Sequence, residues 1–377
     1  MRLPDWPISS ARELELLREV LSSGRWGGHS DFVKRFERDF AAFTHCAHGI
    51  SAMNGTVTLE IALAAAGVGE GDEVIVPAIS FVSTAMAVSR VGAAPVFVDI
   101  EPLSFNLDPQ RAAAAITPRT KAIIPVHFGA AMADLDRLMP LAAEHSLTLI
   151  EDAAHAHGAE WLGRRAGSLG LAGSFSFQNS KVMTAGEGGM LTTNDAAFAG
   201  RAWSIMDQGR KPDGGWFHHY TLGSNYRITG LQAAVLLAQL ERLPEQICRR
   251  TRNVALLRAE LADLPQIAWQ EIPTRQNASS WYLLLGRTAA RDEFHRALTA
   301  QGVPCTPFYP HPLYGNPLYQ QGGCRVEPCP VAEACIRDAF WLPHRALLGD
   351  DETTRQVAAA IRRAIAYEHP YNNDLGR

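Results

Sequence analysis

Lysine is scarce in this 377-residue sequence, in which almost all of the 35 basic side chains are arginine. A lysine amine, unlike a guanidinium, can lose its proton and attack carbon. We therefore expect at least one of the few lysines to serve a chemical role. They are Lys34, Lys121, Lys181 and Lys211.

Long apolar runs and a strong excess of charge are also missing. The longest apolar stretches contain glycine, proline or charge, and the first residues show no apolar signal region, which argues against secretion and membrane spans. A net charge of -4 gives no electrostatic reason to bind nucleic acid or an anionic membrane. None of the six cysteines forms a Cys-x2-Cys pair. We expect reduced thiols in the cytoplasm and no metal site, with a disulfide or a metal as the alternatives.

The first 190 or so residues alternate between strand and helix patterns, which favours a mostly parallel sheet covered by helices on both faces. Strand-like runs lie at 73–76, 95–98, 122–126 and 147–150. Beyond about residue 240, a long helical stretch leads into a smaller, proline-containing region with a terminal helix near 351–367. We therefore predict a large α/β domain over 1–240 and a small domain over 241–377.

Ligands of such sheets bind beyond the carboxyl ends of the strands, so the polar and aromatic residues that follow each strand are candidates. These are Ser80, Phe81, His127, Asp152 and His155. Lys181 follows a further short strand and has no charged neighbour until Glu187. A lysine that is buried has a lowered pKa and can form a Schiff base with an aldehyde. The alternative is an exposed loop lysine.

Three further features suit pyridoxal phosphate, an aldehyde cofactor. Asp152 could pair with the pyridinium nitrogen, whose charge makes the ring an electron sink, or it could cap a helix. The turn Asn54-Gly-Thr at a helix start offers backbone N–H groups to a phosphate, or it is a simple cap. Phe81 could stack on a planar ring or belong to the core.

The sequence resembles the DegT/StrS family of pyridoxal-phosphate sugar aminotransferases over essentially its whole length. The matching motifs are Asn54-Gly-Thr, Pro77-Ala-Ile-Ser-Phe, Pro125-Val-His, Glu151-Asp-Ala-Ala-His-Ala-His-Gly, Ser176-Phe-Gln-Asn-Ser-Lys, Gly186-Glu-Gly-Gly and Gly223-Ser-Asn-Tyr-Arg. The resemblance implies fold type I, the aspartate aminotransferase-like α/β fold. Its large domain would hold a mostly parallel seven-stranded sheet, and its smaller C-terminal domain would be α+β.

The resemblance also implies roles around the cofactor ring. Lys181 would hold the aldehyde carbon as a Schiff base and later move a proton, and Asp152 would pair with the ring nitrogen. His155 would contact the ring hydroxyl, while Phe81 and Ala154 would lie against the two ring faces.

Other residues are implied for the cofactor phosphate. Gly55, Thr56 and Ser176 would bind it within one subunit, and Asn225 would reach the phosphate of the neighbouring subunit. The last role implies a homodimer with shared active sites.

Two branches of the family look nearest: scyllo-inosose aminotransferases and 3-amino-5-hydroxybenzoate synthases. The chain departs from the family in having His127-Phe128-Gly129-Ala130 where many members have His-x-Tyr-Gly, so a tyrosine hydroxyl is missing. It departs from the second branch in having Ser180 where that branch has glycine before its lysine. Candidate substrate contacts, each with packing or a subunit contact as the alternative, are Trp26, Arg227, Tyr309 and His311.

The predicted activity is transfer of an amino group from glutamine or glutamate to a ketone of a sugar or cyclitol in antibiotic biosynthesis. An alternative is a dehydratase that aromatises an amino-ketocyclohexene and needs no amino donor. Sugar 3-dehydratases of this fold carry histidine in place of the lysine, so Lys181 argues against that variant. Intact Lys181 and Asp152 likewise argue against a non-catalytic regulator.

Overall fold

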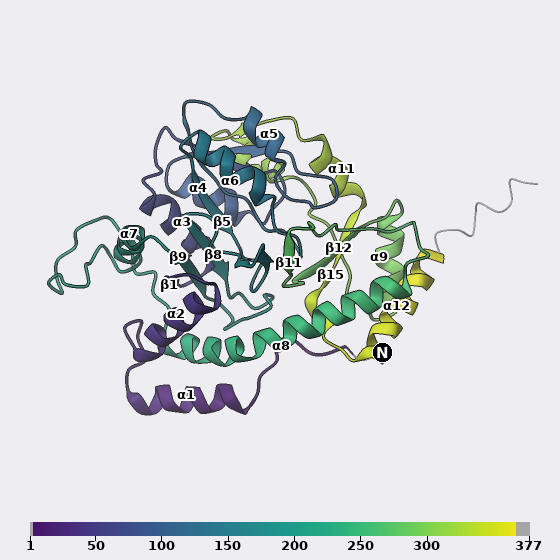
Figure 1. Ribbon diagram of the computed structural model, residues 1–377, viewed down its shortest axis with the longest axis horizontal. Helices are drawn as coiled ribbons and strands as arrows, with labels where there is room; N and C mark the ends of the chain where they lie inside the picture. Colours follow the sequence, from purple (N-terminus) through teal and green to yellow (C-terminus); the bar gives the residue numbers. More distant parts are fainter. Residues whose placement is uncertain (1–2, 367–377) are drawn as a thin grey trace, which may run out of the picture.

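The computed structural model describes residues 3–366, which form a large helix-covered sheet and a smaller sheet joined by one long helix (Figure 1). The large sheet has eight strands in the order β1-β9-β8-β5-β4-β2-β3-β14. All run in the same direction except β9, which is antiparallel to both of its neighbours. The strands are β1 (His48–Ala52), β2 (Glu73–Pro77), β3 (Ala94–Val98), β4 (Thr120–Ile123), β5 (Thr148–Asp152), β8 (Ala172–Ser176), β9 (Gly189–Thr193) and β14 (Arg325–Val326).

Helices bury both faces of this sheet. Alternate residues of one strand enter opposite cores, as in β2, where Val74 and Val76 join one core and Ile75 joins the other. Burial on both faces explains why the parallel strands read as continuous apolar runs. One face is covered by α3 (Gly55–Ala65), α4 (Ser83–Arg90) and α7 (Ala196–Met206). The other is covered by α2 (Asp31–Phe43), α5 (Pro109–Ala114), α6 (Leu135–Glu144) and α8 (Gly230–Glu260).

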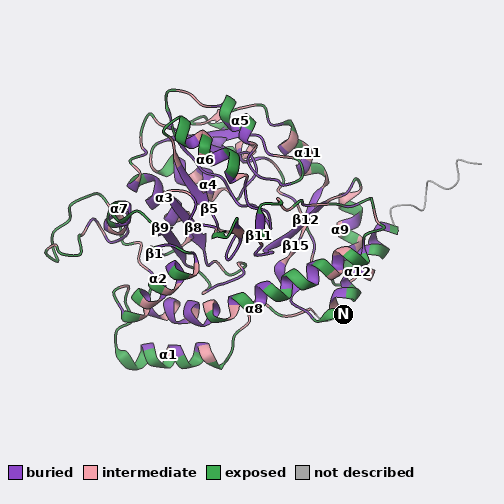
Figure 2. Ribbon diagram, in the orientation of Figure 1, coloured by how far each residue is buried: buried purple, intermediate pink, exposed green. Residues whose placement is uncertain are grey.

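The smaller sheet lies at the far end of α8 (Figure 1), and Figure 2 shows buried and exposed residues alternating along this helix. Its four strands follow the order β10-β12-β15-β13. They are β10 (Ala268–Trp269), β12 (Leu283–Arg287), β15 (Ala339–Pro343) and β13 (Thr306–Pro307). Its helices are α9 (Arg291–Ala300) and α12 (Asp351–Ala366). The remaining helices are α1 (Ala11–Ser23), α10 (Pro317–Gln320) and α11 (Pro330–Asp338), with the short 3-10 helices η1 (Leu313–Gly315) and η2 (His344–Leu347). A third sheet contains β6 (Glu160–Trp161), β7 (Arg164–Arg165) and β11 (Gln276–Ala278).

Most predicted elements are confirmed, and two details differ. The strand predicted over 122–126 ends at Ile123, because Pro125 has no N–H to donate to a ladder. The expected seven strands are present, and β14 adds an eighth by pairing in parallel with β3. The domain boundary predicted at residue 240 stays a prediction; it falls within the continuous helix α8. Residues 367–377 of the predicted small domain lie outside the described residues.

Two sequence predictions concern the whole chain. Within residues 3–366, no helix combines the length and apolarity needed to cross a membrane. The six cysteines all carry free thiols, and burial raises the pKa of Cys305 and Cys329 to about 12. These thiols are therefore poor nucleophiles.

Candidate active site

Lys181 lies in the loop between β8 and β9, beyond the carboxyl end of β8. The side chain is partly buried, and its Nζ atom lies 4.4 Å from the centroid of the Tyr282 ring. Its backbone N–H donates to the Gln178 carbonyl at 2.9 Å. Among residues 3–366, no carboxylate lies within ion-pairing distance of the amine. The amine therefore keeps its lone pair available once it loses a proton.

Asp152 ends β5 and is buried. Its Oδ2 atom accepts a hydrogen bond from the Thr84 hydroxyl at 2.8 Å, and its Oδ1 atom accepts from the Ala154 N–H at 3.2 Å. The Ser80 and Thr84 hydroxyls lie 2.7 Å apart and extend this network. Burial raises the pKa of Asp152, while these hydrogen bonds and the charge of Lys181 oppose the rise. A cationic ring nitrogen would favour the carboxylate further.

His155 is a buried, neutral imidazole at the same sheet edge. Its Nδ1 atom accepts from the Gly129 N–H at 3.3 Å, so its proton resides on Nε2. Burial lowers its pKa well below the usual value, and the Lys181 charge adds to the effect. The His155 ring centroid lies 4.4 Å from Tyr282 and 5.3 Å from Phe128. A neutral Nε2–H is a suitable donor for a phenolate-type oxygen.

Two helix N-termini form a small polar cradle near this edge. A Cβ atom on Gly55 would lie 2.7 Å from the Cβ atom of Ser176, so the first turn of α3 approaches β8 closely only because residue 55 is glycine. The Thr56 hydroxyl at the start of α3 lies 2.6 Å from that of Ser83 at the start of α4. Free N–H groups and hydroxyls in this pattern suit a phosphate.

The two predicted ring-face residues differ in exposure. Ala154 is partly buried and its N–H donates to Asp152, whereas the Phe81 side chain is 58% exposed. An aromatic ring left this exposed is available to stack on a planar ligand.

The predicted substrate residues fall into two groups. The Tyr309 ring lies 6.2 Å from Phe128 and 5.5 Å from Trp341, and burial raises its pKa, with Tyr282 and Asp152 contributing. Tyr309 therefore lies with the residues around Lys181. The His311 Nδ1 atom lies 3.0 Å from the Pro312 carbonyl oxygen and is partly buried.

The other group forms its hydrogen bonds and ion pairs with residues other than Lys181. Arg227 forms an ion pair with the buried Asp207, and Trp26 is exposed, its indole N–H donating to the Leu21 carbonyl. Asn225 is exposed and pairs through its backbone with Asp207. None of these residues contacts Lys181 within the chain.

His127, a candidate because it follows a strand, pairs with a buried carboxylate. Its Nε2–H donates to the buried Glu151 carboxylate at 2.9 Å, and its Nδ1 atom accepts from the Ala133 N–H. Burial alone would raise the pKa of Glu151, but the His127 hydrogen bond and backbone amides of residues 167–170 outweigh it and lower the pKa. The His127–Glu151 pair therefore stabilises the turn at residues 167–170.

Two residues that contact Lys181 or its neighbour Ser180 were not predicted from the sequence. Tyr282 places its hydroxyl 2.9 Å from the Ser180 hydroxyl, and the His344 Nε2–H donates to the Ser180 carbonyl at 3.1 Å. Both come from the second half of the chain, and no local pattern links them to Lys181. Ser83 could have been predicted from the sequence, because it lies in the first turn of the helix that follows β2, as Thr56 lies in the first turn of the helix that follows β1. We call Lys181, Asp152, His155 and Tyr282 the lysine pocket.

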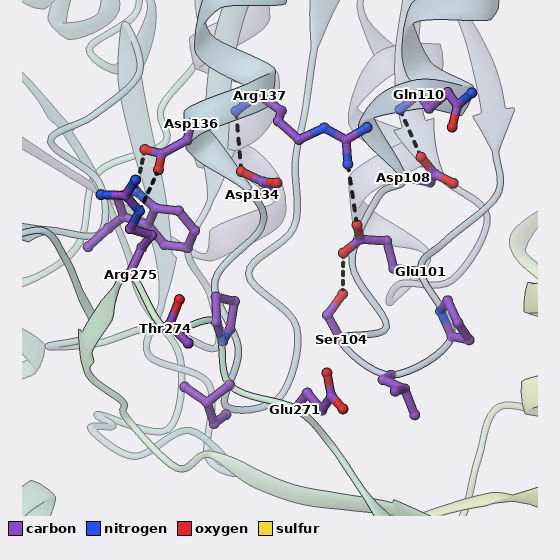
Figure 3. Close-up of a pocket in the computed structure, with 15 residues that line it drawn as sticks. Glu101, Ser104, Asp108, Gln110, Asp134, Asp136, Arg137, Glu271, Thr274 and Arg275 are labelled. Atoms are coloured by element: carbon purple, nitrogen blue, oxygen red, sulfur yellow. Dashed lines mark hydrogen bonds and ion pairs between the residues drawn. The ribbon is translucent and has the colours of Figure 1, made fainter.

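A separate cavity of about 690 Å³ opens between residues 101–137 and residues 271–275 (Figure 3). None of the predicted site residues lines it. Its carboxylates are Glu101, Asp108, Asp134, Asp136 and Glu271, and we call this recess the acidic cavity. Figure 3 shows Arg137 and Arg275 directed toward Glu101 and Asp136.

The fold defines a class, an α/β protein consistent with fold type I, and it brings Lys181 within electrostatic reach of the buried Asp152. Residues 7–362 match the DegT/DnrJ/EryC1/StrS aminotransferase family, and the chain belongs to that family. The predicted family, fold class and transferase type are confirmed.

Among curated relatives, the chain is 38% identical over 380 residues to 3-amino-5-hydroxybenzoate synthase of Amycolatopsis mediterranei (strain S699), covering 96% of this chain and 97% of the relative. It is 39% identical over 403 residues to L-glutamine:2-deoxy-scyllo-inosose aminotransferase of Streptoalloteichus tenebrarius, covering 97% and 94%. A crystal structure of 3-amino-5-hydroxybenzoic acid synthase superposes with a TM-score of 0.92 at 38% identity, covering 97% of this chain and 99% of that one.

Proposed function

We propose that this enzyme uses pyridoxal phosphate to transfer an amino group from glutamine or glutamate to a ketone of a sugar or cyclitol in antibiotic biosynthesis. The observation that carries the proposal is the placement of Lys181 and the buried Asp152 at one edge of the large sheet, within electrostatic reach of each other. Relatives named for cyclitol amination support the substrate class. The cytoplasmic location stays a prediction.

The residues of the lysine pocket fit the cofactor. Lys181 would hold its aldehyde carbon, Asp152 its ring nitrogen and the His155 Nε2–H its ring oxygen, with Phe81 and Ala154 against the ring faces. The cradle formed by Gly55, Thr56 and Ser176, together with Ser83, would hold the phosphate. When bound, the cofactor supplies an electron sink for the carbanion formed at the substrate.

The chain's own groups then carry the proton and the charge. Asp152, held by Thr84 and the Ala154 N–H, would pair with the ring nitrogen as a carboxylate. The Lys181 amine would accept the proton from the α-carbon of the amino donor and deliver a proton to the cofactor's aldehyde carbon. The Tyr282 ring covers one side of the amine and limits the access of water.

A homodimer with shared sites is part of the proposal. The loop that follows α7 projects from the body of the chain (Figure 1) and carries large apolar side chains that one chain leaves in solvent, such as Phe217 at 85% and Leu222 at 95% exposure. Large exposed apolar side chains in one segment are typical of a protein contact. Asn225, exposed at the base of this loop, would reach the phosphate site of the partner.

A second candidate is a dehydratase that aromatises an amino-ketocyclohexene, as in 3-amino-5-hydroxybenzoate synthase. A relative with that name matches this chain as well as the cyclitol aminotransferases do, which favours keeping it. Lys181 would serve both reactions.

The test is a panel of amino donors and ketones, with scyllo-inosose and nucleotide-linked keto sugars included. Absorbance of the cofactor is followed in each half-reaction. We expect glutamine or glutamate to convert the cofactor to its amine form, and a cyclitol or sugar ketone to reverse the change. An aromatic product released without any donor would establish the dehydratase instead. Purified protein that binds no pyridoxal phosphate would contradict both.

A further inference from the structure

Arg250 on α8 is the largest fully buried side chain of the described residues, with no exposed surface. Its Nε–H donates to the Ser280 carbonyl at 2.7 Å. Its Nη1 and Nη2 atoms are buried and have no hydrogen-bond partner among residues 3–366. Burial lowers the pKa of Arg250 to about 9, and no carboxylate offsets the effect. Buried N–H groups almost always have a partner, so this guanidinium requires one.

Buried acceptors without partners lie on the neighbouring elements. The Nδ1 atoms of His157 and His344 and the Oδ1 atom of Asn253 are buried and unpartnered among the described residues. Asn253 lies one turn after Arg250 on α8, and its amide N–H groups bind the carbonyls of Leu347 and Gly349 beyond His344. The charge of Arg250 contributes to lowering the pKa of both histidines, after burial. Unpartnered donors and unpartnered acceptors therefore share one interior region.

The other nitrogen of each histidine holds the chain segment that carries Lys181. The His157 Nε2–H donates to the Ser176 carbonyl at 2.9 Å, and the His344 Nε2–H donates to the Ser180 carbonyl at 3.1 Å. Because a carbonyl only accepts, both rings carry their proton on Nε2 and present a lone pair at Nδ1. The two hydrogen bonds bracket residues 176–180, directly before Lys181.

We propose that Arg250 is a positioning residue for Lys181 and acts through buried water that joins its guanidinium to the Nδ1 atoms of His157 and His344. Water accepts from the Nη–H groups and donates to the imidazole lone pairs, as buried water commonly does with three or so polar partners. An anion would satisfy the guanidinium but would repel two lone pairs. The proposal rests on the proposed function of Lys181.

Arg250 also reaches the other side of the lysine pocket. The Ser280 residue, whose carbonyl binds Arg250, donates its own hydroxyl to the His155 carbonyl. One buried cation thereby connects α8 to both the lysine segment and the His155 backbone. Small displacements of a catalytic group cost rate, so loss of this connection should change turnover more than substrate binding.

The direct test is a crystal structure of the holoenzyme at a resolution that places ordered water. Water within hydrogen-bond distance of an Arg250 Nη atom and of at least one of the two Nδ1 atoms supports the proposal. A dry region, or a halide on the guanidinium, overturns it.

The functional test compares Arg250→Met with Arg249→Met. Arg249 directly precedes Arg250 on α8. It is exposed and, among residues 3–366, pairs only with Glu245 on its own helix, so it receives the same chemical change on the exposed side of α8. In Arg250→Met we expect faster amide hydrogen exchange over residues 176–181 and a kcat lowered about ten-fold with little change in KM. Arg249→Met should leave both quantities at the parent values. Equal exchange and equal kcat in the two variants would overturn the proposal.

A second variant covers the case in which Arg250→Met does not fold. His344→Phe keeps a ring of similar size and removes the bond to the Ser180 carbonyl, so faster exchange over 176–181 is again expected. Unchanged exchange would overturn the proposal. Borohydride reduction of the parent holoenzyme, followed by mass analysis of the Lys181 peptide, tests the proposed function separately. An unmodified Lys181 peptide would overturn that function and leave the water and exchange results to be judged alone.

Discussion

The lysine pocket and the acidic cavity both gather charged residues, but they balance the charges differently. In the acidic cavity, carboxylates are exposed or half-buried and most have a local partner: Asp108 and Asp134 cap α5 and α6, and Asp136 accepts from the Trp161 indole and pairs with Arg275. In the lysine pocket, Asp152 is buried and has only neutral donors within hydrogen-bond distance.

This difference in charge balance favours the lysine pocket over the acidic cavity as the reactive site. Carboxylates that cap helices, form ion pairs and are exposed to solvent stabilise helix ends and contribute little reactivity. A buried carboxylate and an unpaired amine are poised to interact with a ligand, because solvent does not screen them. Substitutions in the lysine pocket should therefore lower turnover much more than substitutions in the acidic cavity, and the largest loss is expected at Lys181.

The largest effect is expected for Lys181→Ala. Loss of the amine removes both the covalent holder of the cofactor and the proton carrier, so turnover should fall by about 10⁴-fold or more. Steady-state kinetics and the cofactor absorbance of the variant measure this, with Lys121→Ala, an exposed lysine, as the matched control. Normal transamination by Lys181→Ala would remove the basis of the assignment.

A smaller loss is expected for Asp152→Asn. Asparagine keeps an oxygen for the Thr84 hydroxyl but lacks the charge opposite the ring nitrogen, so kcat should fall on the order of 10²-fold while the cofactor stays bound. Asp136→Asn makes the same change in the acidic cavity and should leave kcat unchanged. Equal kinetics in the two variants would erase the contrast between the recesses.

Thr84→Val should have an intermediate effect. The substitution preserves shape and removes the donor to Asp152, leaving a buried carboxylate oxygen short of a partner at about 1–3 kcal/mol. We expect kcat to fall roughly ten-fold, since 1.4 kcal/mol corresponds to a factor of ten. Thr44→Val, a buried threonine that donates only to helix carbonyls, is the control. A larger loss of kcat in the control than in Thr84→Val would speak against the role.

The smallest effect is expected for Glu101→Gln. Burial, with Asp108 and Asp134 nearby, raises the pKa of Glu101, so the folded state holds this proton more tightly than the unfolded chain does. Stability from this group is present at low pH and is lost as pH rises from the unfolded value through the raised pKa. Glutamine should therefore raise the free energy of unfolding slightly at pH 8, by less than about 1 kcal/mol after solvent screening, and have no such effect at pH 4. Urea unfolding at both pH values checks the sign, and a loss of stability at pH 8 would contradict it.

Several features were predictable because they depend on short segments. Asn54 caps α3 through its side chain, as its position before Gly55 and Thr56 indicated. The strand that ends at Asp152 was visible as an apolar run and the one before Lys181 as a short strand, and parallel strands bring their carboxyl ends to one edge. The positions of Lys181 and Asp152 at that edge follow from the strand order alone.

Other features depend on contacts between distant residues. His127 was a candidate from its position after a strand, yet its Nε2–H donates to the Glu151 carboxylate, and nothing in the local pattern predicts that partner. Tyr282 and His344 belong to the second half of the chain and meet the lysine segment only because α8 brings the smaller sheet against the large one.

The sequence by itself determined the family and the alternation of strands and helices, and it placed Lys181 and Asp152 after predicted strands. Each of these is written in a local pattern or in the order of motifs along the chain. Only the tertiary structure decided what covers the Lys181 amine, which histidine pairs with Glu151 and where the buried Arg250 guanidinium lies. Those outcomes depend on which buried polar groups find partners, and partners are chosen in space.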